Sequence, residues 1–274
     1  MKKTVEHITS ILSSHAIGID VSKYEESFLL NSFKNKIFEK KINSENEYLS
    51  ILENSEIEAT HFKNSLHNNY TEFFRNPLTY SVLERIILPS LTHSIKYTNQ
   101  KEIRIWSAAC ASGQEPYSIA MLLEELKSDN TENFSYRIFA TDQCDAQIAK
   151  AFIGKYESLE MNNVNMKRVK RWFAKNGNSF IIDPVLKKNI EFSKFDLLDK
   201  KLNSPANSIF GDFDIAVCSN LLFYYKPKFR NIILEKIQHS ISDGGLIITG
   251  EAEREIFLNH QFKEVFPQSA IFRV

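Results

Sequence analysis

Two acidic residues in the C-terminal part of the chain, Glu115 and Asp142, each follow a stretch typical of a buried strand. Glu115 comes after "IRIWSA" and a turn of small residues, and Asp142 ends the run "YRIFATD". An acid at the end of the second strand of a βαβ unit can accept hydrogen bonds from both hydroxyls of an unsubstituted ribose. An acid in the first turn of the intervening helix can reach a positively charged group of the same ligand. Together the two acids indicate a ligand with a free ribose and a cationic substituent.

The turn between the first strand and its helix, "SAACASGQE", contains a single glycine, Gly113. It matches neither GxGxxG nor GxxxxGK[ST], the patterns that present several backbone N–H groups to phosphates. The turn therefore favours a nucleoside without phosphates and argues against a nicotinamide dehydrogenase. A phosphate-free nucleoside with a cationic substituent describes S-adenosylmethionine.

Each acid also has a simpler explanation. Asp142 could cap the helix predicted over 145–153, and Glu115 could merely favour the dipole of the helix in whose first turn it lies. We prefer the ligand interpretation because these features occur together, in order, at the ends of predicted strands.

Short apolar runs alternate with helical patterns from about residue 102 onward. In order they are "IRIWSA", helix 115–127, "YRIFATD", helix 145–153, helix 163–175, "NIEFSKFD", "FDIAVCSN", helix 228–241 and "LIITGEAE". Such alternation predicts a mostly parallel sheet with helices on both faces. Ligands of these sheets bind beyond the carboxyl ends of the strands, where the two acids lie. The predicted fold class is α/β with a Rossmann-like sheet.

The N-terminal part of the chain has a different, all-helical pattern. Apolar residues recur at helical spacing at Val5, Ile8, Ile11 and Leu12, at Phe28, Leu29, Phe33 and Ile37, and at Tyr48, Leu49 and Leu52. The stretch "EFFRNPLTYSVLERIILPSL" predicts a further helix that ends at Pro89. We therefore expect a helical domain over 1–80, a connecting helix and linker over 81–101, and the α/β domain over 102–274. "NSFIIDPVLKKNIEF" suggests a small β insertion at about 176–192.

The composition excludes several classes of protein. Lys+Arg and Asp+Glu number 34 each, which argues against broad electrostatic binding of nucleic acid or membrane. No apolar run approaches the roughly 18 residues of a membrane span, and the first residues do not resemble a signal peptide. The cysteines Cys110, Cys144 and Cys218 have no CxxC spacing, and the histidines are scattered, so we expect a reducing compartment and no metal site. A cytoplasmic monomer is the expectation.

Five ordered motifs make the chain resemble the CheR-type chemoreceptor methyltransferases over nearly its whole length. They are "NYTEFFRNP", "IRIWSAACASGQEPYSIAM", "FATDQCDAQIAKAFIGKY", "KRWFAKNG…NIEFSKFDLLD" and "FDIAVCSNLLFYYKP…GGLIITGEAE". The resemblance implies an all-α N-terminal domain followed by an S-adenosylmethionine-dependent methyltransferase domain with a small β insertion. It also implies methylation of glutamate carboxylates in a chemoreceptor or related signalling protein, with S-adenosylhomocysteine as product.

The resemblance assigns roles to individual residues. Around the methionine part of the cofactor it places Asn69, Thr71 and Arg75, with Glu115 at the amino-acid end and Asp142 at the ribose. Asp196 and Leu197 fall where the family binds adenine, Ser219 and Asn220 follow the fourth strand beside the cofactor, and Tyr224 faces the methyl group with Arg75.

The expected chemistry needs no general base. A glutamate side chain, with an ordinary pKa of about 4.3, is already ionised at neutral pH. Arg75 could clamp this carboxylate through charge-assisted hydrogen bonds, and the hydroxyl of Tyr224 could orient it. Alternatively, Arg75 forms a structural salt bridge and Tyr224 packs in the core beside Phe223 and Tyr225.

The chain departs from the family pattern at several positions. Ser219 stands where the family usually has Arg, Asp196 where it usually has Asn, and Cys144 where an acidic residue is common. The stretch "LLNSFKNKIFEKK" lacks the arginines that family members often present to receptors, and acids outnumber bases over residues 1–75. These departures motivate an alternative, a non-catalytic signalling module of the same fold that binds S-adenosylmethionine or S-adenosylhomocysteine.

Overall fold

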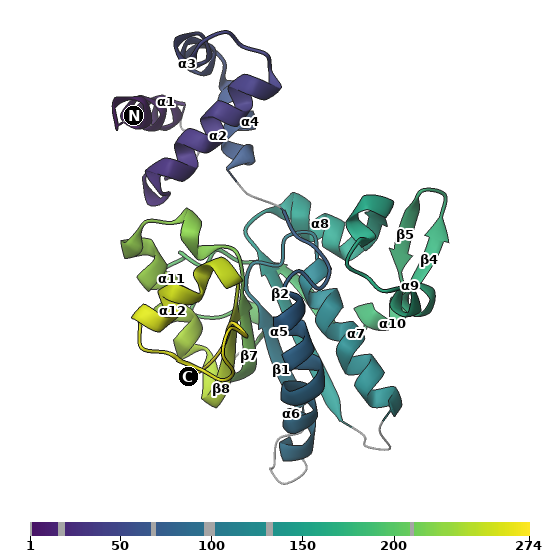
Figure 1. Cartoon of the computed structure of the whole chain (residues 1–274). Coiled ribbons are helices and arrows are strands. Elements are labelled where there is room, and N and C mark those ends of the chain that lie inside the picture. Colours follow the sequence, from purple (N-terminus) through teal and green to yellow (C-terminus); the bar gives the residue numbers. More distant parts are fainter. Residues whose placement is uncertain (1, 16–19, 67–69, 96–101, 130–133, 209–210) are drawn as a thin grey trace. The chain divides into compact units, whose positions relative to one another are not determined.

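The computed structural model describes residues 2–15, 20–66, 70–95, 102–129, 134–208 and 211–274 of the chain (Figure 1). The chain forms two compact units. Unit 1 comprises Met1–Asn68 with Phe223–Asn231, and unit 2 comprises Asn69–Leu222 with Ile232–Val274. The predicted domain limits at 80 and 101, and those of the β insertion, stay predictions. No described helix combines the length and the apolar character that crossing a membrane would require.

Unit 1 is built from four α-helices, as the apolar spacing predicts. They are α1 (Lys2–Ser14), α2 (Glu26–Glu39), α3 (Glu45–Asn54) and α4 (Glu56–Ser65), with a 3₁₀ turn, η1 (Val21–Lys23). Ser44 and Ser55 begin α3 and α4, because each side chain accepts a hydrogen bond from a backbone N–H of the first turn. The side chains of Ile8, Phe33 and Tyr48 are fully buried between the helices.

A seven-stranded sheet forms the centre of unit 2, in the order β6-β2-β1-β7-β8-β10-β9. Its strands are β1 (Glu102–Ser107), β2 (Ser135–Asp142), β6 (Ile190–Lys194), β7 (Phe213–Cys218), β8 (Ile241–Thr249), β9 (Lys263–Glu264) and β10 (Ile271–Arg273). The first five pair in parallel, and β10 is antiparallel to both of its neighbours. The predicted α/β fold with a mostly parallel sheet is confirmed.

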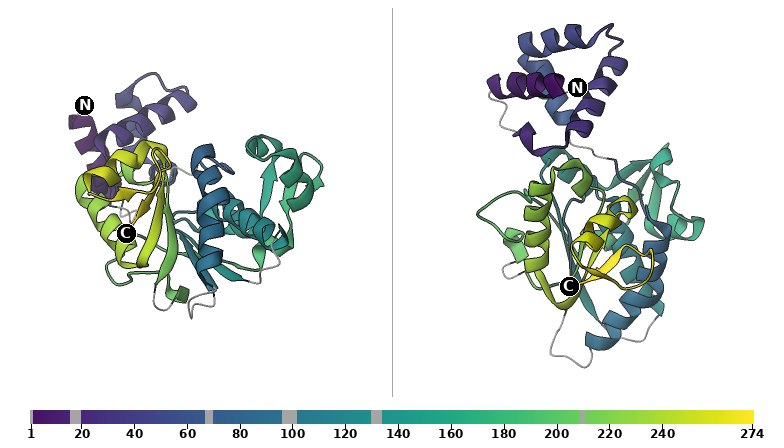
Figure 2. Two further views of the ribbon diagram at one scale, coloured as in Figure 1. Left: turned by 60° about the horizontal axis from the view of Figure 1, so that its bottom comes forward. Right: turned by 60° about the vertical axis from the view of Figure 1, so that its left-hand side comes forward.

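Helices cover both faces of this sheet (Figures 1 and 2). The strand order runs outward from β1 in two directions, toward β2 and β6 and toward β7 and β8. Because parallel crossovers are right-handed, the helices of the two halves lie on opposite faces. The helices are α7 (Gln114–Asp129) and α8 (Asp145–Ile153) in one half, then α11 (Pro227–His239) and α12 (Arg254–Asn259) in the other, with short 3₁₀ turns η4 (Ala206–Ser208), η5 (Leu222–Tyr224) and η6 (Glu251–Glu253).

The helix before the sheet differs from the prediction. Residues 77–95 form α5 (Pro77–Val82), a π-helical turn (Leu83–Ile87) and α6 (Leu88–Ile95), so the helix continues past Pro89. The prediction that Pro89 ends the helix is therefore wrong. The backbone N–H of Leu88 donates to the carbonyl of Leu83, five residues back. A widened turn just before Pro89 fits a residue that has no N–H to continue the ordinary ladder.

A small antiparallel sheet, in the order β3-β5-β4, lies along the chain between β2 and β6. Its strands are β3 (Lys155–Glu157), β4 (Phe173–Asn176) and β5 (Ser179–Ile182), accompanied by η3 (Ser158–Met161), α9 (Met166–Trp172) and α10 (Pro184–Lys187). The helix predicted over 163–175 is wrong in extent, because its last residues pair as β4 with β5. The segment Ile190–Lys194 joins the main sheet instead.

Candidate functional site

The site begins where the central strands β1 and β7 end side by side. Chain order reverses between these two strands, which is where open α/β sheets bind ligands. After β1 the backbone turns through Ala111, with φ +45°, and Gly113, with φ +92°. A Cβ on Gly113 would lie 2.9 Å from that of Ala151 in α8, so glycine allows both the unusual φ and the close approach of the helix. The small-residue turn is thereby held in a fixed shape.

Asp142 fixes this turn from the neighbouring strand. One carboxylate oxygen accepts the backbone N–H of Ala111 at 3.0 Å, and the other accepts that of Cys144 at 2.9 Å. Burial raises the pKa of Asp142, and the backbone donors oppose that rise. Asp142 thus shapes both turns while remaining an acceptor with further lone pairs, which suits ribose hydroxyls.

Glu115 lies in the first turn of α7, half-buried beside the end of β1. The hydroxyl of Ser107 donates to its carboxylate at 2.7 Å. Burial raises the pKa of Glu115 to about 7, with the charge of Glu253 acting in the same direction and that of Arg75 against it. The ionised carboxylate is therefore short of compensating positive charge, which a bound cation would supply.

The "TEFFRN" motif approaches the same edge of the sheet. Phe74 is buried with φ +50°, and its backbone N–H donates to the hydroxyl of Ser118 in α7 at 3.1 Å. The next residue, Arg75, is half-buried, lies over the ring of Tyr70 at 5.0 Å and donates to the Tyr70 carbonyl. Because the charge of Arg75 lowers the pKa of Glu115, their side chains share one electrostatic environment. Thr71, the first residue of the motif, is also half-buried.

After β7 the chain turns through Ser219 and Asn220, both half-buried. Asn220 has φ +59°, a conformation that Asn tolerates better than most residues. Its side-chain amide packs against Gly250 at the end of β8, where an added Cβ would come within 2.6 Å of Nδ2. The contact fixes the Asn220 side chain beside the sheet.

Sequence reasoning missed the residue that holds this turn, Glu253. Its side chain is fully buried, and its carboxylate accepts the backbone N–H groups of Asn220, Leu221 and Leu222. Burial raises its pKa and these donors lower it. The sequence signal for Glu253 is that it is the second acid of "GEAE", directly after an apolar strand. Its sequence neighbours do not indicate which groups it binds.

Asp196 and Leu197 follow β6, next to the end of β2. The backbone N–H of Phe195 donates to the carbonyl of Asp142 at 3.0 Å, which sets this segment beside the ribose candidate. Asp196 is exposed and accepts the backbone N–H of Leu198, whereas Leu197 is buried. Their assignment to adenine stays a prediction.

Two predicted site residues stand apart from this description. Asn69 lies outside the described residues. Tyr224 belongs to unit 1, where its ring contacts Phe28 at 4.6 Å and its carbonyl accepts the backbone N–H of Glu25 at 2.8 Å. The roles predicted for both residues stay predictions.

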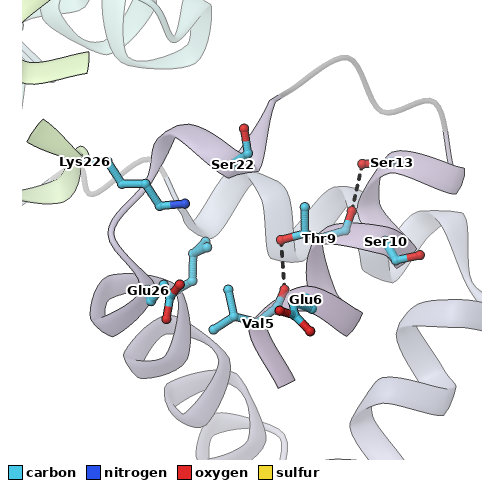
Figure 3. A pocket seen from close by; sticks show the side chains of 9 residues that line it. Val5, Glu6, Thr9, Ser10, Ser13, Ser22, Glu26 and Lys226 are labelled. Carbon is cyan, nitrogen blue, oxygen red and sulfur yellow. Dashed lines mark hydrogen bonds between the residues drawn. The ribbon is translucent and has the colours of Figure 1, made fainter. Parts of the chain in front are cut away.

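A cavity of about 420 Å³ lies elsewhere, within unit 1, between α1, η1 and α2 (Figure 3). The hydroxyls of Thr9 and Ser13 point along α1 and donate to carbonyls of their own helix. Predicted site residues are not among those that line it, which are Val5, Glu6, Thr9, Ser10, Ser13, Ser22, Glu26, Leu29 and Lys226.

The chemistry of the donor set fits S-adenosylmethionine. Glu115 offers an under-compensated negative charge, Asp142 offers free acceptor capacity, and the Ala108–Gly113 turn is too poor in glycine to cradle phosphates. No cluster of potential metal ligands occurs in the described ranges. Cys110 and Cys218 are buried, which raises the pKa of both thiols, and no described cysteine forms a disulfide.

Comparison with known proteins adds an independent line of evidence. The family model described as "CheR methyltransferase, SAM binding domain" matches residues 69–271. A chemotaxis protein methyltransferase of Listeria monocytogenes is 30% identical over 87% of this chain and 85% of its own length. One from Borreliella burgdorferi is 30% identical over 86% and 83%, and chemotaxis protein methyltransferase 1 of Pseudomonas aeruginosa is 33% identical over 68% and 66%.

Proposed function

The chain belongs to the CheR methyltransferase family, and from this premise we propose how its own residues serve the reaction. It is a protein-glutamate O-methyltransferase that uses S-adenosylmethionine in chemotaxis. The observation that carries the assignment of residues is the half-buried Glu115, whose pKa of about 7 marks a carboxylate in need of a cation.

Glu115 and Asp142 hold opposite ends of the cofactor in this proposal. Glu115 pairs with the α-ammonium group, which restores the charge balance that burial disturbs. Asp142 accepts the ribose hydroxyls with lone pairs that its backbone donors leave free. Thr71 and Asn69 enclose the methionine part, Ser219 and Asn220 line the cofactor, and Asp196 and Leu197 contact the adenine.

Bound S-adenosylmethionine supplies an electrophilic methyl group on a sulfonium. The acceptor glutamate is already ionised at neutral pH, so the reaction needs no general base from the chain. Its task is to align the acceptor oxygen and to keep water out. We assign the alignment to the guanidinium of Arg75, which is half-buried and anchored on Tyr70, and to the hydroxyl of Tyr224.

The acceptor protein is a component of chemotaxis, and we propose that it is a chemoreceptor, as the names of the relatives suggest. We further propose that the protein acts as a monomer, does not bind nucleic acid, since its basic and acidic residues balance at 34 each, and works in the cytoplasm. The free cysteines accord with a reducing compartment.

A transfer assay tests the proposal. The purified protein is incubated with tritiated S-adenosylmethionine and membranes from its own cells, and base-labile methyl label is measured on the receptor bands. We expect such label from the wild type, and about 100-fold less transfer from Arg75→Ala, with S-adenosylhomocysteine affinity within a few-fold. Absence of base-labile label with the wild type contradicts the proposal, and equal losses of binding and transfer in Arg75→Ala contradict the role of Arg75.

A further inference from the structure

Glu253 is a buried acid outside the residues assigned above, and among the described residues its carboxylate accepts mainly backbone N–H groups. Oε2 lies 2.6 Å from the backbone nitrogen of Asn220 and 3.2 Å from that of Gly250, and the hydroxyl of Thr249 is 3.0 Å away. Oε1 accepts the backbone N–H groups of Leu221 and Leu222 at 2.7 and 2.5 Å. One carboxylate thus collects the backbone donors of two strand ends, β7 and β8.

The turn that these bonds hold would not keep its shape unaided. Asn220 has φ +59°, a backbone conformation that is unfavourable for most residues with a side chain. Three successive N–H groups, from Asn220 to Leu222, converge on a carboxylate that is fully buried. Left without an acceptor, each of these donors would destabilise the folded protein, because it would give up its hydrogen bond to water and gain none in return. Because one carboxylate accepts all three N–H groups, it fixes the backbone of the turn and with it the direction in which the Asn220 side chain projects.

Gly250 completes the arrangement from the other side. Its N–H donates to Glu253, and its bare Cα lets the Asn220 amide approach so closely that a Cβ would lie 2.6 Å from Nδ2. Gly250 has φ −77°, a value open to alanine, so space rather than backbone conformation requires glycine here. Glu253 holds the backbone of Asn220, and Gly250 sets the place of its amide.

We propose that Glu253 is a positioning residue for cofactor binding, acting through the 219–222 turn to present Asn220 to the ligand. The inference rests on the proposed cofactor role of Asn220. Glu253 itself need not touch the cofactor, because its carboxylate is already occupied by the turn.

Glu253→Gln is the direct test, because glutamine keeps the shape but turns an amide –NH₂ toward backbone donors. Calorimetric titration with S-adenosylhomocysteine separates two effects: the stoichiometry reports the folded fraction, and the dissociation constant reports the site. We expect the dissociation constant to rise about tenfold or more. Gly250→Ala, which leaves the carboxylate in place and displaces the Asn220 amide, should raise it as well and serves if Glu253→Gln does not fold.

Glu264 provides a matched control. It also accepts backbone N–H groups, those of Gln268 and Ala270, and it pairs with Arg254, but it holds a loop outside the candidate site. Glu264→Gln should lower the melting temperature while leaving the dissociation constant unchanged. A general loss of stability would affect both glutamine variants alike, whereas positioning raises the constant in Glu253→Gln alone.

Asn220→Ala separates failure of the inference from failure of the assigned site. If Glu253 acts through Asn220, then Asn220→Ala weakens binding and adding Glu253→Gln weakens it little further. Unchanged affinity in both Glu253→Gln and Gly250→Ala, with weakened affinity in Asn220→Ala, overturns the inference alone. Unchanged affinity in Asn220→Ala overturns the assignment of Asn220 and the inference with it.

Discussion

Two glutamates in different units, Glu58 in α4 and Glu115 in α7, have opposite surroundings. Glu58 is buried, and it accepts hydrogen bonds from the Lys40 ammonium at 2.6 Å and the Tyr48 hydroxyl at 2.8 Å. These donors lower its pKa despite burial. Glu115 receives one hydrogen bond at its carboxylate from the described part of the chain, that of Ser107, and its pKa rises to about 7.

In our proposal, this difference separates a carboxylate that serves the fold, Glu58, from one that serves a ligand, Glu115. The folded protein itself supplies the positive charge and the donors that Glu58 needs, so its interactions are complete without a partner molecule. At Glu115 burial exceeds what Ser107 and the more distant Arg75 compensate. Perturbed carboxylates of this kind concentrate at functional sites. We therefore expect a variant of Glu115 to weaken ligand binding without destabilising the fold, and a variant of Glu58 to destabilise the fold without weakening ligand binding.

Glu115→Gln should have the largest effect on ligand binding. Removing the charge should raise the dissociation constant for S-adenosylhomocysteine about 100-fold, since a charge-assisted hydrogen bond is worth up to about 3 kcal/mol. The unliganded protein should become about 2 kcal/mol more stable at pH 8, because an ionised buried group is replaced by a neutral one that still accepts from Ser107. Titration calorimetry and urea unfolding measure the two effects. Unchanged affinity would remove Glu115 from the site.

Glu58→Gln should do the reverse and serves as the matched variant. It breaks the pair with Lys40 and weakens the acceptor for Tyr48, so we expect a loss of about 2 kcal/mol of stability. The dissociation constant for S-adenosylhomocysteine should stay within twofold of wild type. If Glu58→Gln weakens binding as strongly as Glu115→Gln does, the contrast between a structural Glu58 and a ligand-binding Glu115 is wrong.

The pH dependence of binding should be smaller, about tenfold between pH 6 and pH 8. Ligand affinity rises with pH as Glu115 ionises with its pKa of about 7, and Glu115→Gln should abolish the rise. Stability of the unliganded protein moves in the opposite direction: the contribution of Glu115 is lost as pH rises from 4.5 to about 7, because its pKa is higher in the folded state. The charged groups that act on Glu115 are Glu253, which raises its pKa, and Arg75, which lowers it. Affinity that is flat over this range in the wild type would contradict the cation assignment.

Local patterns predicted much of the fold of unit 2 and the position of two candidate site residues in the sequence relative to its strands. The helix over 145–153 has the predicted bounds, because apolar spacing, the acid at its start and Gly154 after its end all agree. Glu115 and Asp142 were placed because strand, turn and acid are contiguous in the sequence. The alternation of strands and helices also sufficed to predict a parallel sheet, whose strand ends then had to share one edge.

Features that depend on distant partners could not be predicted in this way. Glu253 was missed because the N–H groups it binds lie more than 30 positions away in the chain. The unusual conformation of Phe74 depends on a hydroxyl 44 positions away, that of Ser118. The π-helical turn before Pro89 accommodates a proline inside a helix, which sequence rules treat as an end.

The proton balance of binding tests the central claim, that Glu115 is held ready for a cationic nucleoside. Calorimetry of S-adenosylhomocysteine binding at pH 6.5, in two buffers of different ionisation enthalpy, measures the protons released. With a pKa of about 7, Glu115 is about three-quarters protonated at pH 6.5 before binding, so the wild type should release about 0.75 protons and Glu115→Gln close to none. Equal release by both proteins, or none by the wild type, would contradict the claim.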